Sequence, residues 1–368
     1  MIPRSAYERS IQQFLAPVAS LMNDPTVSEI LINGPDRIFA ERQGRLLETD
    51  AHFPSQHALL CALRNIAQYL GRECDDEHPI LEGHLPDGSR IEAVLPPIAA
   101  AGPTVAIRRF SKERLTLQRL LSLGALNDDV LVLLRKAVSE KQNILVSGGT
   151  GSGKTSLLNA ISALIPGNER VVVLEDAQEL QLQGDHVVQL GVRPKDAAGR
   201  GEVTMRDLLK ATLRLRPDRI VIGEIRGPEA LELTQIMTSG HGGCLSTIHA
   251  SYPKDALQRL ETLAMMSDVN LPLFALRGQI ASGINLIVQT DRKRDGRRGI
   301  TQVTRVIGCD ANAGYQLQDL FTRDEGDSFR SPGDSQCNTP ALSPAQRLAF
   351  HPVANGPQQR VTLPATKV

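Results

Sequence analysis

The sequence predicts an α/β protein in which a mainly parallel sheet is preceded by a smaller α+β domain. From about residue 128 onward, short and almost continuously apolar runs alternate with segments of helical period. The first 110 residues instead combine helix patterns with strands of period two. Strands that are apolar along their whole length are typical of a parallel sheet covered by helices on both faces.

The first domain is expected to span residues 1–110. Residues 6–22 carry apolar side chains at helical spacing, with an interruption near Pro17. Period-two alternation then runs through residues 28–49, around the turn signals Asn33-Gly34 and Gln43-Gly44, and predicts paired strands. A helix over residues 57–71 and two strand-like runs, 89–98 and 102–110, complete a small sheet.

A linker that becomes helical is expected over residues 111–127, and a second domain over 128–322. The predicted strands of this domain are NILVS, RVVVLE, RIVIGE and CLSTIHA, with helices such as TMRDLLKATLRLR and PEALELTQIMTS between them. A basic hairpin tip, DRKRDGRRG, joins INLIVQT to ITQVTRVIG and is interpreted as a solvated turn. Residues 323–368 are rich in Pro, Ser, Gly and Gln and are predicted to be a disordered tail.

Charge, cysteine content and hydropathy narrow the class of protein. Lys+Arg and Asp+Glu both number 41, which disfavours a nucleic-acid partner because phosphate contacts call for a basic excess. The five cysteines are odd in number and lack CxxC spacing, which argues against a disulfide framework and a zinc ribbon. No secretory signal is apparent, and no apolar run approaches the roughly 18 residues that span a bilayer. We therefore expect a cytoplasmic protein that reaches a membrane only through partners.

The most specific motif is SGGTGSGKTS, which follows the strand NILVS and opens a helix. It contains the spacing Gly148-x-x-x-x-Gly153-Lys154-Thr155 of a P-loop, in the strand–loop–helix context that the motif requires. Glycines let successive backbone N–H groups turn toward a phosphate, and the helix N-terminus adds its positive dipole end. The motif predicts a nucleoside triphosphate site, with Lys154 at the β- and γ-phosphates and the Thr155 hydroxyl on Mg²⁺. The residues expected to bind the nucleotide here are Gly148, Gly149, Thr150, Gly151, Ser152, Gly153, Lys154, Thr155 and Ser156.

Two strand ends supply carboxylates for phosphoryl chemistry. Glu224 ends the strand RIVIGE, and Glu175 ends RVVVLE. The carboxyl ends of neighbouring strands in a doubly wound sheet share one crevice with the P-loop, so both acids are expected to face the γ-phosphate. We assign Glu224 to Mg²⁺, together with Thr155, and Glu175 to polarising the attacking water, although the two roles could be exchanged. For Glu179, a few residues later, a site role and a surface role stay open.

The stretch SGHGGCLSTIHA places His241 and His249 on either side of an apolar run. A zinc site would need a third ligand and usually a fourth, and Cys244 is the only obvious candidate. Ordinary packed histidines are a second alternative. We favour a sensor role, in which a histidine at a strand end touches the γ-phosphate, because its ring donates a hydrogen bond in either protonation state.

Together these motifs resemble the secretion ATPase superfamily of bacterial type II and type IV secretion and pilus systems. The resemblance covers about residues 20–308 and is strongest to the CpaF/TadA type, which powers tight-adherence (Flp) pili, with the traffic ATPases of type IV secretion next. In that family VLEDAQEL corresponds to the Asp box and GHGGCLSTIHA to the His box. The remaining motifs that carry the resemblance are SEILINGPDRIF, LPDGSRIEAVLPP, GPTVAIRRF, VSGGTGSGKTSLLNA and LRLRPDRIVIGEIRGPEA.

The resemblance implies a flexible linker between the α+β domain and a RecA-like ATPase domain, and assembly into a hexameric ring. It agrees with the nucleotide, metal and hydrolysis roles given above to the P-loop and the two acids, and with a phosphate role for both histidines. It further implies that Arg214 acts at the subunit interface and that Arg90 and Arg108 close over the nucleotide.

The sequence thus predicts a Mg²⁺-dependent ATPase motor, peripheral at the inner face of the cytoplasmic membrane. Its substrate would be ATP, and its partners would be further copies of itself and the inner-membrane platform through which it drives pilus assembly or substrate export. One alternative is a RecA-like DNA-translocating or conjugation-linked ATPase with a basic channel. Another is a nucleotide-bound scaffold with negligible turnover.

Overall fold

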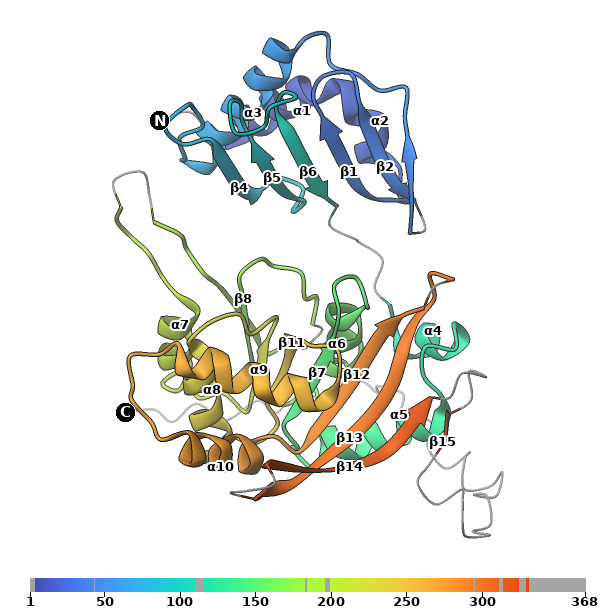
Figure 1. Ribbon diagram of the computed structural model, residues 1–368, viewed down its shortest axis with the longest axis vertical. Helices are drawn as coiled ribbons and strands as arrows, with labels where there is room; N and C mark the ends of the chain where they lie inside the picture. Colours follow the sequence, from blue (N-terminus) through green and yellow to red (C-terminus); the bar gives the residue numbers. More distant parts are fainter. Residues whose placement is uncertain are drawn as a thin grey trace, which may run out of the picture. The chain divides into compact units, whose positions relative to one another are not determined.

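The computed structural model describes residues 4–42, 44–109, 115–182, 184–195, 199–293, 295–310, 314–323 and 329–330. Two sheets organise these residues (Figure 1). One sheet has six strands and belongs to the first part of the chain, and the other has nine strands and belongs to the second. The predicted fold class, an α/β domain preceded by an α+β domain, is confirmed.

The first sheet is antiparallel throughout, in the order β3-β2-β1-β6-β5-β4. Its strands are β1 (Val27–Asn33), β2 (Ile38–Arg42), β3 (Arg45–Glu48), β4 (Ile80–His84), β5 (Arg90–Val94) and β6 (Thr104–Arg108). The helices of this domain are α1 (Arg4–Phe14), the 3₁₀ turn η1 (Ala16–Val18), α2 (Ala19–Asn23) and α3 (Gln56–Leu70).

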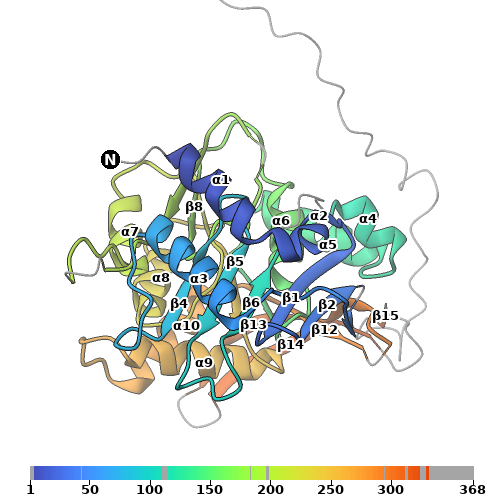
Figure 2. The ribbon, with the colours of Figure 1, turned by 90° about the horizontal axis from the view of Figure 1, so that it is seen from above.

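Local chemistry explains where these helices begin and end. The break between α1 and α2 falls at Pro17, as the sequence predicts. Ser55 caps α3 by accepting a hydrogen bond from the N–H of Ala58, and Gly71 ends the helix in the left-handed region at φ 67°. Helices α1 and α3 lie side by side (Figure 2) and bury apolar side chains such as Ile11 and Leu63 in one core with the strands.

The second sheet has the order β15-β14-β13-β12-β7-β11-β10-β8-β9. From β12 to β9 the neighbouring strands are parallel, and from β12 to β15 they are antiparallel. The strands are β7 (Ile144–Gly148), β8 (Val171–Glu175), β9 (Val187–Gly191), β10 (Arg219–Ile222), β11 (Leu245–His249), β12 (Leu286–Arg292), β13 (Arg298–Asp310), β14 (Gly314–Arg323) and β15 (Phe329–Arg330).

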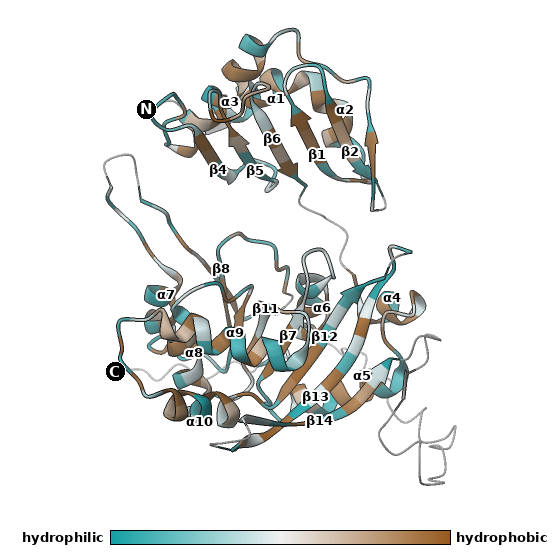
Figure 3. Cartoon of the chain, in the orientation of Figure 1, coloured by the Kyte–Doolittle hydropathy of each residue, from teal (hydrophilic) through white to brown (hydrophobic). Residues whose placement is uncertain are grey.

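Helices cover both faces of this sheet. One core packs α7 (Met205–Thr212), α8 (Glu229–Thr238), α9 (Pro253–Met265) and α10 (Leu273–Gly283) against the strands. A second core packs α4 (Leu117–Ser122), α5 (Asp128–Ser139) and α6 (Lys154–Ser162) against the other face. Strands β7, β8 and β10 are buried along their whole length, which accounts for their mainly apolar side chains (Figure 3).

Two predicted boundaries differ from the structure. Helix α4 falls within the expected linker, yet Leu117 and Leu120 are buried in the core of the second domain. Strand β14 continues to Arg323 and pairs with β15, so the sheet reaches residue 330 rather than ending at 322. The remainder of the expected tail, 331–368, lies outside the described residues. Among the residues the structure describes, no helix has the length and apolar character needed to cross a membrane.

Candidate nucleotide site

The P-loop joins β7 to α6, as the sequence predicts. Gly151 and Gly153 adopt positive φ angles of 69° and 97°, a region that favours glycine. Gly148 is needed for a different reason, because a Cβ atom there would lie 2.4 Å from the hydroxyl oxygens of Ser152 and Thr290. The loop therefore curls between a buried strand and a helix N-terminus, which is the geometry of an anion site.

A side chain of the neighbouring strand β12 forms hydrogen bonds with the loop and with β7. The Oγ1 atom of Thr290, near the end of β12, donates to the carbonyl of Ser147 at 3.1 Å and lies 2.9 Å from Oγ of Ser152. Ser152 Oγ also lies 2.9 Å from the carbonyl of Gly149. The sequence does not single out Thr290, because its contact spans more than a hundred residues.

Lys154 is almost fully buried at the start of α6. Its ammonium donates to the carbonyl of Gly149 at 2.9 Å and lies 3.3 Å from Nδ1 of His249. Burial lowers the pKa of Lys154, and the nearby Glu224 carboxylate opposes that shift. The ammonium of Lys154, which is expected to bind phosphate, thus contacts the loop itself and His249.

Glu224 links the lysine to two further side chains. Its Oε1 lies 2.8 Å from Nε2 of His249, and its Oε2 accepts from Nη2 of Arg226 at 2.5 Å. Arg226 Nη1 in turn lies 3.5 Å from Oδ2 of Asp176. A continuous polar chain thus runs from Lys154 to Asp176 past the carboxyl ends of β7, β11, β10 and β8. Sequence reasoning missed Arg226, although it stands only two residues after Glu224.

The two contacts of His249 define its protonation. If Nε2 donates to Glu224, then Nδ1 is the acceptor for the ammonium of Lys154, which is the arrangement of a neutral ring. Burial lowers the pKa of His249 and so favours the neutral form, against the opposing effect of the Glu224 carboxylate. His249 therefore lies between a cation and an anion, in surroundings where burial favours its neutral form.

Glu175 has a different environment from Glu224. It is 2% exposed, and its Oε1 accepts from the backbone N–H groups of Glu179 at 3.0 Å and Leu180 at 2.7 Å. Burial raises the pKa of Glu175 to about 7, although both N–H groups oppose the shift. This carboxyl group anchors the segment that follows β8, and its hydrogen bonds among the described residues all go to Oε1.

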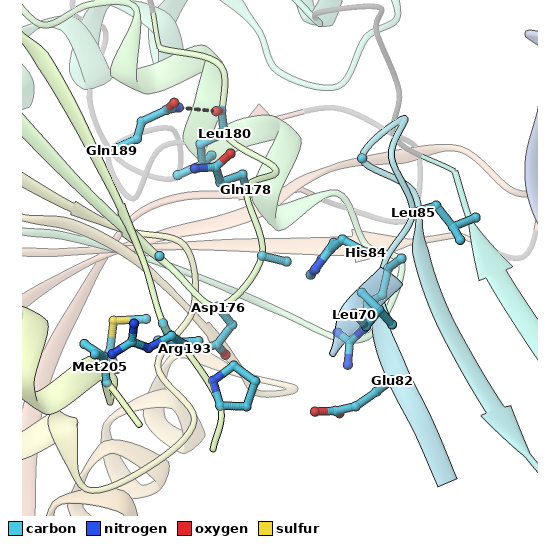
Figure 4. A pocket seen from close by; sticks show the side chains of 18 of the residues that line it. Leu70, Glu82, His84, Leu85, Asp176, Gln178, Leu180, Gln189, Arg193 and Met205 are labelled. Atoms are coloured by element: carbon cyan, nitrogen blue, oxygen red, sulfur yellow. Dashed lines mark hydrogen bonds between the residues drawn. The ribbon is translucent and has the colours of Figure 1, made fainter. Parts of the chain in front are cut away.

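The anchored segment forms part of a cavity wall. Asp176 and Gln178 line the cavity together with Arg193 and Met205 (Figure 4). Gln189 of β9 supports the wall by donating to the carbonyl of Leu180 at 3.0 Å, drawn as a dashed line in Figure 4. The Asp box is thus held in place by Glu175 and Gln189 while its polar side chains stay accessible.

The two predicted histidines do not converge. His249 is the last residue of β11, whereas His241 precedes that strand and lies 3.4 Å from Oγ of Ser239. A five-residue strand separates them by about 16 Å, at about 3.3 Å per residue. A zinc site that uses both histidines and Cys244 is therefore excluded by geometry, and only His249 lies beside the P-loop of its own chain.

The three predicted arginines lie outside this polar chain. Arg214 is exposed just after α7, before the amino end of β10, and its side chain has no hydrogen bond or ion pair among the described residues. Because the P-loop lies at the opposite ends of the strands, Arg214 does not belong to the phosphate site of its own chain. Arg90 and Arg108 are brought together, since they stand opposite each other on β5 and β6 of the first sheet.

Comparisons with known proteins show the family to which the chain belongs. Residues 12–333 match the family model of the type II/IV secretion system protein. Conjugal transfer protein TrbB of Rhizobium radiobacter is 37% identical over 302 residues, which cover 81% of this chain and 88% of TrbB. Type IV secretion system protein PtlH of Bordetella pertussis is 33% identical over 326 residues, which cover 80% of this chain and 95% of PtlH.

Among solved structures, the ATPase DotB of Legionella pneumophila aligns with a TM-score of 0.52 at 22% identity, over 79% of each chain, and supports the fold. The predicted membership of the secretion ATPase superfamily is confirmed, while the tight-adherence branch within it stays a prediction. The chain belongs to the type II/IV secretion system protein family.

Proposed function

We propose that this protein hydrolyses ATP to ADP and phosphate and uses the reaction to drive pilus assembly or substrate export through an inner-membrane platform. The observation that carries the proposal is the polar chain of Lys154, His249 and Glu224 beside the P-loop. It gathers a phosphate-binding cation, a hydrogen-bonding ring and a carboxylate at one end of the sheet. Phosphoryl transfer needs these groups, because catalysis rests on positioning and on stabilising charge.

The residues present fit a magnesium ion. The hydroxyl of Thr155, in the first turn of α6, and the partly exposed carboxylate of Glu224 offer the oxygen donors that Mg²⁺ prefers. The bound ion would neutralise charge on the β- and γ-phosphate oxygens. Lys154 would exchange its contacts with Gly149 and His249 for phosphate oxygens, and the P-loop N–H groups would bind the same phosphates.

Glu224 is assigned to the metal and Glu175 to the attacking water. Two observations support a role for Glu175: its pKa is raised to about 7, and Oε2 has no hydrogen bond among the described residues. A carboxyl group with a pKa near the working pH is suited to accepting a proton. His249 would then sense the γ-phosphate, because a phosphate at Lys154 replaces the contact that the lysine now makes with the ring.

The position of Arg214 supports assembly of several copies of this chain, which we propose to form a hexameric ring. Arg214 stands at the far end of the sheet from its own P-loop and would act on the nucleotide of an adjacent copy, and His241 lies at that same end. An arginine supplied across an interface contributes on the order of 10³–10⁵ in rate. Arg90 and Arg108 would close over the nucleotide, so that hydrolysis releases the first domain and produces rigid-body movement.

A conjugation-linked ATPase is the second candidate, and it is favoured by two relatives that are named as TrbB conjugal transfer proteins. This function uses the same site, and only the cargo differs. The equal numbers of acidic and basic residues, 41 each, disfavour direct movement of DNA by this chain. In this candidate the motor would act on the conjugation machinery rather than on the nucleic acid.

One set of assays separates the proposed ATPase motor from a DNA-translocating ATPase and from a nucleotide-bound scaffold. We expect Mg²⁺-dependent ATP turnover that falls by about a hundredfold or more in Glu224→Gln and that does not respond to added DNA. Turnover that DNA stimulates would favour a DNA-translocating ATPase. Nucleotide binding without turnover in the wild-type protein would favour a scaffold and contradict the proposal.

A further inference from the structure

The basic hairpin between β12 and β13 lies against the P-loop. Strand β12 pairs in parallel with β7, and this register places Thr290 opposite Gly148. The hydrogen bonds of Thr290 hold the two strands together there. Two residues later Arg292 stands opposite Arg298 of β13. The sequence predicts a solvated turn here, and residues 295–298 are exposed in the structure. The first and last arginines of the hairpin also lie next to the phosphate loop.

The distances to the loop are those of direct packing. A Cβ atom built on Gly153 would lie 3.9 Å from Cδ and 4.0 Å from Cβ of Arg298, and one built on Gly151 would lie 3.8 Å from Nη1 of Arg292. Arg298 therefore runs along the outer side of the loop at the residue that precedes Lys154. Its guanidinium begins one bond beyond this Cδ atom.

The side chain of Arg298 is exposed at the start of β13. Among the described residues its side chain makes no hydrogen bond or ion pair, whereas the guanidinium of Arg292 already donates to a backbone carbonyl at 3.0 Å. Like charges directly opposite each other on neighbouring strands are destabilising. Partial burial, and next the charge of Arg292, lower the pKa of Arg298, while the Glu41 carboxylate opposes the shift.

An anion beside Gly153 would relieve this cost. We propose that Arg298 binds the phosphate chain of the nucleotide within its own chain, as a second cationic contact beside Lys154. Arginine is suited to this role, because its planar fork donates two hydrogen bonds to one phosphate group. The inference rests on the proposed function only in that the P-loop must bind a nucleotide, and it requires no turnover.

The test measures binding to the full-length protein by calorimetric titration with ADP and with inorganic pyrophosphate. We expect Arg298→Ala to raise the Kd of both ligands at least about tenfold, because a charge-assisted contact is lost. Arg298→Lys should give an intermediate value. The matched control is Arg297→Ala, because Arg297 is the adjacent residue of the hairpin and is ion-paired with Asp295 at 2.7 Å. It should change both Kd values less than twofold.

Thermal unfolding without ligand tests for damage to the fold. Arg298→Ala should unfold at the same temperature as the wild type or higher, because it removes a charge without a partner. Equal Kd values for Arg298→Ala and Arg297→Ala would overturn the proposal. A higher Kd of Arg298→Ala for ADP with an unchanged Kd for pyrophosphate would overturn the proposal too, because Arg298 would then contact the nucleoside rather than the phosphates.

The Lys154→Ala variant separates this inference from the proposed function. If Lys154→Ala loses ADP binding and Arg298→Ala does not, only the role of Arg298 is wrong. If the wild-type protein binds neither ADP nor pyrophosphate, the role of Arg298 and the proposed function are both wrong.

Discussion

Polar side chains gather at both ends of the parallel strands in the second sheet, but they are bonded differently at the two ends. At the carboxyl ends Lys154, His249 and Glu224 bond mainly to one another's side chains. At the amino ends Asn143 and Arg219, both buried, donate to the backbone carbonyls of Gly283 and Val138, and Arg219 also pairs with the carboxylate of Glu169. Contacts between side chains can be exchanged for a ligand, whereas contacts to the backbone of packed elements cannot. The first end is therefore suited to binding and the second to stability.

The largest effect on ATP turnover is expected from a substitution at the carboxyl ends of the parallel strands. Lys154→Ala should lower ATP turnover by about a hundredfold or more, because the central phosphate contact is lost. Its free energy of unfolding should hardly change, since the lysine is a buried cation held by exchangeable partners. Steady-state turnover and urea unfolding measured on one preparation check both parts. A large loss of stability would show that the lysine is structural and would remove the contrast between the two ends.

At the amino ends the expected effect is on stability instead. Asn143→Ala should cost about 3 kcal/mol of unfolding free energy, because it leaves the buried N–H of Cys244 and the carbonyl of Gly283 without partners. The KM for ATP should stay within about twofold in the folded fraction. Gln142→Ala is the matched control, since Gln142 is the half-buried neighbour and its side chain bonds only to the exposed Glu140 among the described residues, so stability should change by less than about 0.5 kcal/mol. Equal losses in the two variants would contradict the structural role of Asn143.

Glu175 is expected to make stability depend on pH. Its pKa is about 7 in the folded protein, against 4.5 for an unperturbed glutamate, so the folded protein holds the proton more tightly than the unfolded chain does. The stabilisation is fully present below about pH 4.5 and is lost as the pH rises through about 7. Compared with the wild type, Glu175→Gln should thus gain up to about 3 kcal/mol between pH 5 and pH 8.

Urea unfolding at several pH values measures this gain, with Glu140→Gln as a control that removes an exposed carboxylate. Parallel pH profiles for the wild type and Glu175→Gln would show that the carboxyl group is not held in its neutral form. A parallel assay of turnover would tell whether the buried group also takes part in hydrolysis.

A smaller effect is expected at Arg226, which holds Glu224 and Asp176 together but is not expected to touch the nucleotide. Arg226→Ala should lower kcat by about tenfold and leave KM nearly unchanged, because Glu224 loses its orientation rather than its charge. Arg226→Lys should restore part of kcat. Arg170→Ala, at the amino ends of the strands, should change kcat less than twofold. A rise in KM without a loss in kcat would place Arg226 in nucleotide binding.

Local sequence patterns predicted most of the fold and part of the site. The buried strands of the second sheet were predicted because each is apolar along its whole length. Strand β4 was missed because Ile80 is exposed and Gly83 interrupts the run, and β9 because it is only half-buried. The P-loop was predicted from its spacing together with the strand before it and the helix after it.

The contacts that complete the site could not be predicted, because they join strands far apart in the sequence. Thr290 and Arg298 reach the P-loop only through the pairing of β12 with β7. The distance between His241 and His249 likewise depends on the strand between them. Arg226 could have been predicted from the sequence, because an arginine two residues after Glu224 is a natural ion-pair partner of that carboxylate.

The central claim is that Arg214 of one copy completes the nucleotide site of another, and mixing two inactive variants tests it most directly. Lys154→Ala keeps Arg214 but cannot bind nucleotide, while Arg214→Ala keeps the P-loop but cannot complete the site next to it. Mixed at equal concentration under conditions that let subunits exchange, they should recover clear ATP turnover, because some interfaces then combine an intact P-loop with an intact arginine. Turnover of the mixture that never exceeds the sum of the two separate proteins would contradict the account.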